Sequence, residues 1–161
     1  MGAEDVVSVL DALEAADVRA DVAGGWGVDA LLGEQTREHG DLDLLVEAQG
    51  EAAALAELGR LGYRPHVDWR PVRIAVVDDD GREVDLHPVV YDATGHGVQA
   101  NVAGREPFEY PASDFVDGVI GGRAVRCLSA AAQAALHDGY PARDIDRHDL
   151  AVLARLARTP G

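Results

Sequence analysis

The segment that decides the fold runs from Gly24 to Val46 and has the sequence GGWGVDALLGEQTREHGDLDLLV. Two adjacent glycines precede the apolar residues 26–32, and Gly33 follows them. A glycine at the end of a short apolar stretch is typical of a helix C-terminus, and a glycine pair is typical of a tight turn. The first half of the segment therefore predicts a turn that leads directly into a short helix.

The second half carries two acidic residues, Asp41 and Asp43, at the start of a predicted strand over 41–46, after a polar loop over 34–40. Side chains alternate along a strand, so the two carboxylates share one face and the leucines share the other. Residues two apart in a strand lie about 6.6 Å apart. Two carboxylates on one face can therefore converge on a pair of metal ions spaced about 3.5–4 Å.

A third acidic residue follows the same pattern in the stretch EVDLHP, residues 83–88. Val84 and Leu86 are expected to face the core, which turns Asp85 to the opposite face. If this strand is a neighbour of the first, Asp85 joins Asp41 and Asp43. Oxygen ligands without cysteine suit Mg²⁺.

The same segment also offers a site for an anion. A helix that begins at Gly24 and Gly25 presents free backbone N–H groups, which favour phosphate. In the sequence TREH, Arg37 supplies a fork of donors for a phosphate, and Thr36 and His39 flank it. A histidine bonded within the loop is the rival explanation for His39. Carboxylates for metal beside a phosphate cradle predict a nucleoside triphosphate site.

The rest of the chain predicts an α/β (α+β) fold with a mixed β-sheet flanked by helices. We expect one domain over 1–161, with a core over about 1–128 and C-terminal helices over about 129–158. The predicted helices cover residues 5–18, 26–32, 52–61, 129–138 and 144–157. The predicted strands cover residues 20–24, 41–46, 63–67, 72–77, 83–87 and a hairpin over 119–128 with a Gly121-Gly122 turn. Residues 91–112 are expected to form a long loop with at most a short strand at 98–102.

Composition narrows the classes of function. The formal net charge of −15 argues against nucleic acid and anionic membranes as partners, and suits a small cation and divalent metals. All fourteen basic residues are arginine, which excludes a P-loop lysine and a Schiff base. Cys127 is the only cysteine, so no cysteine-based zinc site is expected. No apolar run reaches 18 residues and the N-terminus is unlike a signal peptide, so we expect a cytoplasmic protein.

The motifs GGWGVDALLG, REHGDLDL, LGYRPHVDW, VDLHPV, VQAN, RCLSAAAQAALHDGY and DRHDL together resemble the lincosamide nucleotidyltransferases. They resemble more distantly the aminoglycoside nucleotidyltransferases of the DNA polymerase beta superfamily. The resemblance covers residues from about 20 to 155 and implies the nucleotidyltransferase fold. It also implies that Asp41, Asp43 and Asp85 bind two Mg²⁺ ions, with Asp85 serving also as general base. Residues 91–118 match the family least and are expected to line the acceptor pocket.

The resemblance implies an enzyme that moves a nucleoside monophosphate, with AMP favoured, from an NTP to a hydroxyl of a small cationic antibiotic. A lincosamide is favoured over an aminoglycoside, and ATP is favoured as donor. Two alternatives stay open: a nucleotide-binding antitoxin-like or regulatory module, and an enzyme that adenylylates a protein. The chain is expected to be a monomer or a homodimer.

Four further residues allow both a ligand contact and a structural role. His87 lies two residues after Asp85 on the same predicted strand face. Trp69 follows a predicted strand in an arginine-rich stretch and could form a substrate wall or an edge of the core. Tyr140 and Arg143 belong to the late family motif, and a direct ligand contact is considered for Arg143.

Overall fold

The computed structural model describes residues 1–137 and 141–156. Its helices are α1 (Ala3–Ala15), α2 (Gly24–Leu32), α3 (Glu51–Arg60), α4 (Ala130–Ala135) and α5 (Asp144–Leu156). The strands are β1 (Ala20–Val22), β2 (Asp41–Glu47), β3 (Arg64–Trp69), β4 (Arg73–Val77), β5 (Glu83–Tyr91), β6 (Gly97–Gln99), β7 (Phe108–Tyr110), β8 (Phe115–Ile120) and β9 (Arg123–Leu128). None of the helices in these residues is long and apolar enough to cross a membrane.

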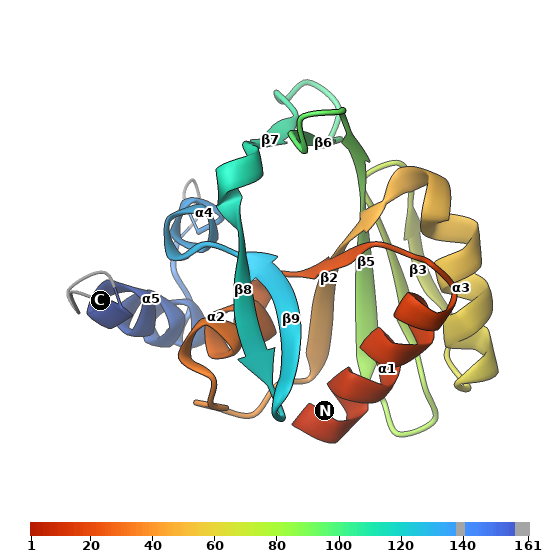
Figure 1. Cartoon of the computed structure of the whole chain (residues 1–161), viewed down its shortest axis with the longest axis horizontal. Coiled ribbons are helices and arrows are strands. Elements are labelled where there is room, and N and C mark those ends of the chain that lie inside the picture. Colours follow the sequence, from red (N-terminus) through yellow and green to blue (C-terminus); the bar gives the residue numbers. More distant parts are fainter. Residues whose placement is uncertain (138–140, 157–161) are drawn as a thin grey trace.

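The strands form one mixed sheet in the order β3-β4-β5-β2-β1-β9-β8, and β6 and β7 extend from β5. β2 is parallel to β5 and antiparallel to β1, while β8 and β9 form an antiparallel hairpin. The mixed sheet with flanking helices confirms the predicted fold class. Figure 1 shows α1 and α3 beside the β2–β5 part of the sheet, and α2, α4 and α5 grouped beside β8 and β9.

The core confirms the alternation predicted for β2 and β5. Leu42, Leu44, Val84 and Leu86 are fully buried, and they pack in one cluster with apolar residues of α1 such as Leu13. The residues between them face the other way, so the acidic side chains lie on the side of the strands opposite this cluster. Burial of the leucines and valines thus fixes the direction of the carboxylates.

The predicted hairpins are present, with shifted ends. β4 and β5 pair around residues 78–82, and β8 and β9 pair around the Gly121-Gly122 turn. The last hairpin begins at Phe115 and not at 119, because residues 115–118 pair with 125–128. α1 covers residues 3–15 where 5–18 was expected, and α4 ends at Ala135. The expected helix ends at residues 138, 157 and 158 lie outside the described residues.

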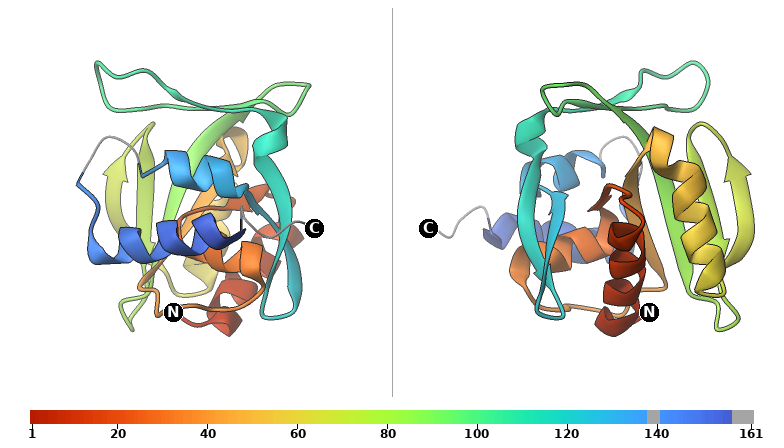
Figure 2. Two further views of the ribbon diagram at one scale, coloured as in Figure 1. Left: turned by 90° about the vertical axis from the view of Figure 1, so that its left-hand side faces the viewer. Right: turned by 45° about the vertical axis from the view of Figure 1, so that its right-hand side comes forward.

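The expectation for residues 91–112 was partly right: the short strand considered at 98–102 overlaps β6, but β7 was not expected. β5 continues to Tyr91, β6 pairs antiparallel with its last three residues, and β7 pairs with β6. Figure 2 shows this segment crossing from the end of β5 toward β8. β6 and β7 are each only three residues long, which is too short for the alternation of apolar and polar residues that predicts a strand. The backbone partner of β6 is the end of β5, and the partner of β7 is β6.

Candidate active site

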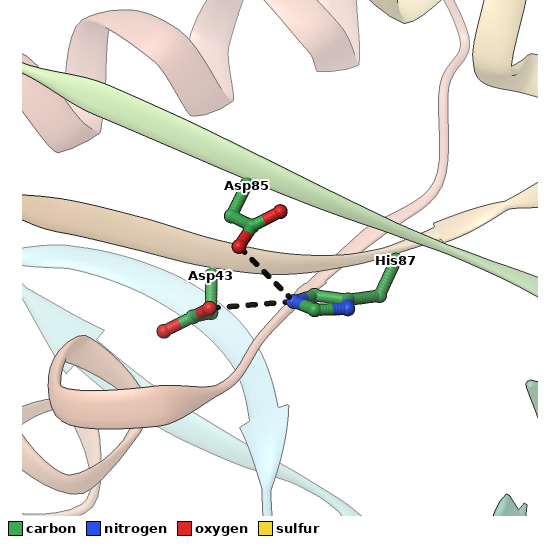
Figure 3. A group of neighbouring side chains, drawn as sticks. All are labelled: Asp43, Asp85 and His87. Carbon is green, nitrogen blue, oxygen red and sulfur yellow. Dashed lines mark hydrogen bonds and ion pairs between the residues drawn. The ribbon is translucent and has the colours of Figure 1, made fainter. Parts of the chain in front are cut away.

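Asp43 and Asp85 are direct neighbours across the parallel strands β2 and β5. Figure 3 shows their carboxylates converging on the imidazole of His87. His87 Nε2 lies 3.3 Å from Asp43 Oδ1 and 3.8 Å from Asp85 Oδ2. Asp43, Asp85 and His87 each offer one ligand atom, and these atoms lie within 4.8 Å of one another. The strands are therefore neighbours, as the prediction required.

Asp85 is the most buried of the predicted acids. Its carboxylate is 9% exposed and receives an ion pair from Arg73, whose Nη2 lies 2.7 Å from Asp85 Oδ2. Burial raises the pKa of Asp85 to about 6; the charge of Asp43 adds to the increase, while His87 and Arg73 oppose it. Because burial makes the ionised form of Asp85 unfavourable, binding of a cation or of a proton to this carboxylate would lower its free energy.

Asp41 lies two residues before Asp43 on the same strand face, opposite Glu83. It is exposed at the start of β2 and lines the same cavity as Asp43. The surrounding protein atoms and then the charge of Asp43 raise the pKa of Asp41. The structure thus places all three predicted acids on one side of the sheet, with Asp85 deep and Asp41 at the rim.

His87 is held between the acids. Burial alone would lower the pKa of His87, but the hydrogen bond to Asp43 and the charges of Asp43 and Asp85 outweigh burial and the net shift is upward. The other ring nitrogen, Nδ1, faces Gln99 at 3.3 Å. The sequence had left open whether His87 belongs to the site, and the structure places it at the centre.

The two glycines of the opening segment form the first residues of α2. Gly24 has a φ of 57°, which favours glycine, and a Cβ there would collide with Asp43 Oδ2. A Cβ on Gly25 would collide with Arg37 Nη2 and lie 2.6 Å from His39 Nδ1. The helix N-terminus therefore approaches the acidic face of β2 so closely that side chains are excluded.

Thr36 and His39 are both bound to Asp29 inside the protein, and for His39 this is the structural alternative to a nucleotide contact. His39 is 4% exposed, its Nε2 lies 2.5 Å from Asp29 Oδ2, and its ring packs on Trp26 with centroids 4.6 Å apart. Thr36 Oγ1 donates to Asp29 Oδ1 at 2.6 Å and contacts His148 Nε2 at 3.0 Å. Burial raises the pKa of Asp29, but hydrogen bonds from His39 and Thr36 outweigh it and the net shift is downward.

Arg37 is bound to α5. Its Nε and Nη2 donate to the two carboxylate oxygens of Asp149 at 2.9 and 2.7 Å, and Nη1 donates to the carbonyl of Glu38. The hydrogen bonds that Arg37 donates to Asp149 raise the pKa of Arg37. Arg37 still lines the cavity with 20% of its side chain exposed. The phosphate fork predicted for Arg37 is therefore already occupied by a carboxylate.

A cavity of about 310 Å³ connects these groups. Its lining includes the α2 glycines, Asp41, Asp43, His87 and Arg37, and it continues to Gln133, His137, Arg143 and Asp149. Gln133 is 1% exposed, its Nε2 has no hydrogen-bond partner among the described residues, and this nitrogen lies where a Cβ on Gly27 would be. Arg143 Nη2 donates to Asp146 Oδ1 at 3.0 Å. Tyr140 lies outside the described residues.

A larger groove of about 540 Å³ lies between α1 and β9. It contains none of the three predicted acids, and each of its arginines, Arg19, Arg123 and Arg126, is ion-paired with a carboxylate. By volume alone this groove would be the stronger candidate, but its three arginines already have carboxylate partners. The smaller cavity is the better candidate because it combines an acid cluster, a helix N-terminus and an unpaired buried amide.

Trp69 lies at the end of the edge strand β3 and is 63% exposed, which excludes the core position considered for it. The Arg73 guanidinium lies 5.3 Å from the centroid of its ring. Because Arg73 also contacts Asp85, Trp69 borders the acidic cluster from the β3 side.

Several site residues were not found from the sequence. Five residues form a hydrogen bond with a predicted site residue or with the partner of one: Asp29, Arg73, Gln99, Tyr110 and Asp149. Asp29 and Asp149 lie in helices, where an acidic residue is normally a solvated surface residue, and only their burial shows otherwise. The late motif DRHDL was the one available signal for Asp149.

The comparisons with known proteins agree with this geometry. The family model described as aminoglycoside-2''-adenylyltransferase matches residues 5–153. A lincosamide resistance protein of Staphylococcus haemolyticus is 31% identical over 147 residues, which is 91% of each chain. A 2''-aminoglycoside nucleotidyltransferase of Klebsiella pneumoniae is 32% identical over 80% of this chain and 70% of its own.

Solved structures give the same result. The lincosamide antibiotic adenylyltransferase LnuA, in its lincomycin-bound crystal structure, superposes with a TM-score of 0.86 at 31% identity over 95% of this chain and 96% of its own. ANT(2'')-Ia in complex with adenylyl-2''-tobramycin has a TM-score of 0.70 at 21% identity over 96% of each chain, which shows a common fold. The chain therefore belongs to the aminoglycoside-2''-adenylyltransferase family of antibiotic nucleotidyltransferases.

Proposed function

We propose that the protein transfers AMP from ATP to a hydroxyl of a lincosamide antibiotic and releases pyrophosphate. The observation that carries the proposal is the register pairing of Asp43 with Asp85 in front of the glycine N-terminus of α2. This arrangement puts two of the acids for metal, Asp41 and Asp43, beside the N–H groups for phosphate in the lining of one cavity. The lincosamide relative, which aligns over nearly the whole chain, supports the acceptor class.

The residues present fit magnesium. Asp43 and Asp85 are close enough that the charge of Asp43 raises the pKa of Asp85, and a divalent cation would relieve this repulsion. We propose that Asp41, Asp43 and Asp85 hold two Mg²⁺ ions. When bound, magnesium neutralises the triphosphate and lowers the pKa of the acceptor hydroxyl.

The donor side is formed by α2 and the loop over 34–40. The N–H groups at Gly24 and Gly25 are positioned to donate to the triphosphate at the helix N-terminus. Arg37 contributes its charge beside Gly25 while Asp149 fixes its orientation. Thr36 and His39 hold the loop in place through Asp29, and we assign them a positioning role.

Asp85 is the proposed general base. The acceptor oxygen attacks the α-phosphorus, the bond to pyrophosphate breaks, and the hydroxyl proton passes to Asp85. An ordinary aspartate is a weak base for an alcohol. The pKa of Asp85 is raised to about 6 in the metal-free protein, and a bound cation would lower it again, so magnesium would also have to activate the hydroxyl. Arg73 forms an ion pair with the Asp85 carboxylate, and its guanidinium lies near the Trp69 ring. An acceptor hydroxyl that reaches Asp85 would therefore come close to Arg73 and Trp69. We therefore assign Trp69 to the acceptor side.

The acceptor class can be tested by salt dependence. Leu45, Phe108 and Ile145 give the cavity apolar surface, which favours an acceptor bound by apolar burial and hydroxyl contacts. Affinity for a polycationic aminoglycoside should fall steeply with added salt, whereas affinity for a lincosamide should change little. Pyrophosphate release with ATP and Mg²⁺ is measured with both drug classes at low and high salt. Turnover of neither class would refute the choice of substrate.

The two alternatives are tested in the same assay. A nucleotide-binding module without turnover would need no complete acid set, so the presence of all three acids counts against it. Asp43→Asn should abolish pyrophosphate release and leave the melting temperature nearly unchanged, because Asp43 is partly exposed and its size is kept. Normal turnover by this variant would refute the metal-based mechanism. AMP transfer to protein, with no drug turnover, would favour the protein-adenylylating alternative.

A further inference from the structure

A chain of three hydrogen bonds runs from β7 to the acidic cluster. Tyr110 Oη donates to Gln99 Oε1 at 2.7 Å, Gln99 Nε2 lies 3.3 Å from His87 Nδ1, and His87 Nε2 lies 3.3 Å from Asp43 Oδ1. Each residue comes from a different strand, in the order β7, β6, β5 and β2. The segment expected to be a loop therefore reaches the proposed metal ligands through side chains.

The chemistry of the groups gives the chain a direction. Burial raises the pKa of Tyr110, so its hydroxyl keeps its proton and can donate. With Oε1 of Gln99 accepting that proton, the amide N–H of Gln99 faces His87 Nδ1. Nδ1 must then accept, and in a neutral imidazole the ring proton lies on the other nitrogen. His87 therefore presents Nε2–H to the carboxylates.

The chain is anchored in the protein interior. Tyr110 is 4% exposed and packs against Phe115, with ring centroids 6.1 Å apart, in a cluster with Leu45 and Val89. Gln99 is 5% exposed, so its amide depends on protein partners. Rotation of the Gln99 amide would turn Oε1 toward His87 Nδ1 and would require a proton there. A neutral His87 would then present an unprotonated Nε2 to the two carboxylates, which is unfavourable.

Asp43 is confined from both sides. His87 contacts Oδ1, and Oδ2 lies where a Cβ on Gly24 would be. These two contacts hold the carboxylate in one orientation. Hydrogen bonds from neighbouring residues that do not bind the metal are known to orient metal ligands in this way.

We infer that Gln99 and Tyr110 are positioning residues that keep His87 as a hydrogen-bond donor to Asp43, so that His87 orients a metal ligand and does not bind the metal itself. This inference rests on the proposed function. The competing possibility uses the same three atoms: with Nε2 deprotonated, Asp43, Asp85 and His87 would form a mixed nitrogen and oxygen site, which favours transition metals over Mg²⁺.

The protonation of His87 can be observed without any turnover. Long-range ¹H–¹⁵N correlation spectra of protein labelled at histidine distinguish a protonated from an unprotonated ring nitrogen, and His87→Gln identifies the His87 signals. We expect a protonated Nε2 both in EDTA and with Mg²⁺. An unprotonated Nε2 with Mg²⁺ would overturn the inference and favour the metal-ligand alternative. In Gln99→Glu, which offers only acceptors to Nδ1, we expect Nδ1 to become protonated; an unchanged Nδ1 would also overturn it.

Kinetics test the positioning role. Tyr110→Phe removes only the hydroxyl and should lower kcat about 10- to 100-fold, with an unchanged KM for ATP. Tyr91→Phe is the matched control: Tyr91 Oη donates to Asp21, in a partly buried hydrogen bond that does not lead to His87. Both variants should lose similar stability, and only Tyr110→Phe should lose kcat. Equal kcat values would overturn the inference, whereas a wild-type protein inactive on every acceptor would refute the proposed function and leave the spectra interpretable.

Discussion

Ionisation of Asp85 should destabilise the metal-free protein, and Asp85→Asn should remove that effect. The pKa of Asp85 rises from 3.8 to about 6 on folding, because burial disfavours the charged form. At 1.36 kcal/mol for each pH unit, the increase corresponds to about 3 kcal/mol. The carboxylate is only 9% exposed, so screening by solvent reduces this value little.

The sign follows from the direction of the shift. The folded state binds the proton more tightly than the unfolded state, so this contribution to stability is fully present below pH 3.8 and is lost as the pH rises through about 6. About half of the change, roughly 1.5 kcal/mol, falls between pH 5 and pH 8. The ion pair with Arg73 forms only with the ionised carboxylate, so its effect is already contained in the pKa of Asp85.

The measurement is urea unfolding in EDTA at several values between pH 5 and pH 8, for wild type, Asp85→Asn and Glu38→Gln. Glu38 is an exposed acid of the 34–40 loop and controls for the loss of one charge. The stability of Asp85→Asn relative to wild type should increase by about 1.5 kcal/mol across this range, whereas Glu38→Gln should show no such trend. A flat difference for Asp85→Asn would refute the raised pKa, and with it the argument for Asp85 as base.

Three further substitutions test separate parts of the site. Gly24→Ala should abolish turnover, because the new Cβ would collide with Asp43 at a φ of 57°; wild-type pyrophosphate release by this variant would contradict the close approach of α2. Arg37→Ala should lower the free energy of unfolding by about 3–5 kcal/mol, since it leaves the buried Asp149 carboxylate without its partner. The double variant with Asp149→Ala should cost less than the sum of the single changes, and additive costs would show that the pair is not coupled. Trp69→Ala should raise the KM for the acceptor and leave stability within about 0.5 kcal/mol; an altered KM for ATP alone would place Trp69 on the wrong side of the site.

The arrangement of the acids was predictable because it depends on short-range rules. The alternation along residues 41–46 and 83–87 follows from the strand period of two, and burial of the leucines fixes which face the acids occupy. The prediction required the two acidic strands to be neighbours. In the structure they are neighbours, and Asp43 pairs with Asp85 in a parallel register. The glycine turn and the Gly33 stop of α2 also follow from local backbone chemistry.

The environment of the 34–40 loop was not predictable in the same way. The roles expected for Thr36, Arg37 and His39 came from their own side chains, whereas their observed contacts depend on Asp29 and on residues of α5 that lie 112 positions away. A polar side chain near an anion site and a polar side chain bonded to a buried carboxylate look identical in a sequence. β7 was missed for a related reason, because its pairing with β6, which in turn pairs with β5, is a tertiary property.

The attachment of α5 has a consequence for how the protein should respond to heat. The main apolar contacts of α5 are Val152 and Leu153 against Val28 of α2, in a small cluster separate from the main core. A helix held by so few apolar contacts is expected to open in a sub-global step, at a lower free energy than unfolding of the sheet. Such an opening would release Arg37 and Thr36 together, so nucleotide binding would be lost in molecules whose sheet is still intact. Amide hydrogen exchange along residues 144–156 would then report the fraction of competent enzyme, and inactivation on warming should precede the loss of β-sheet structure.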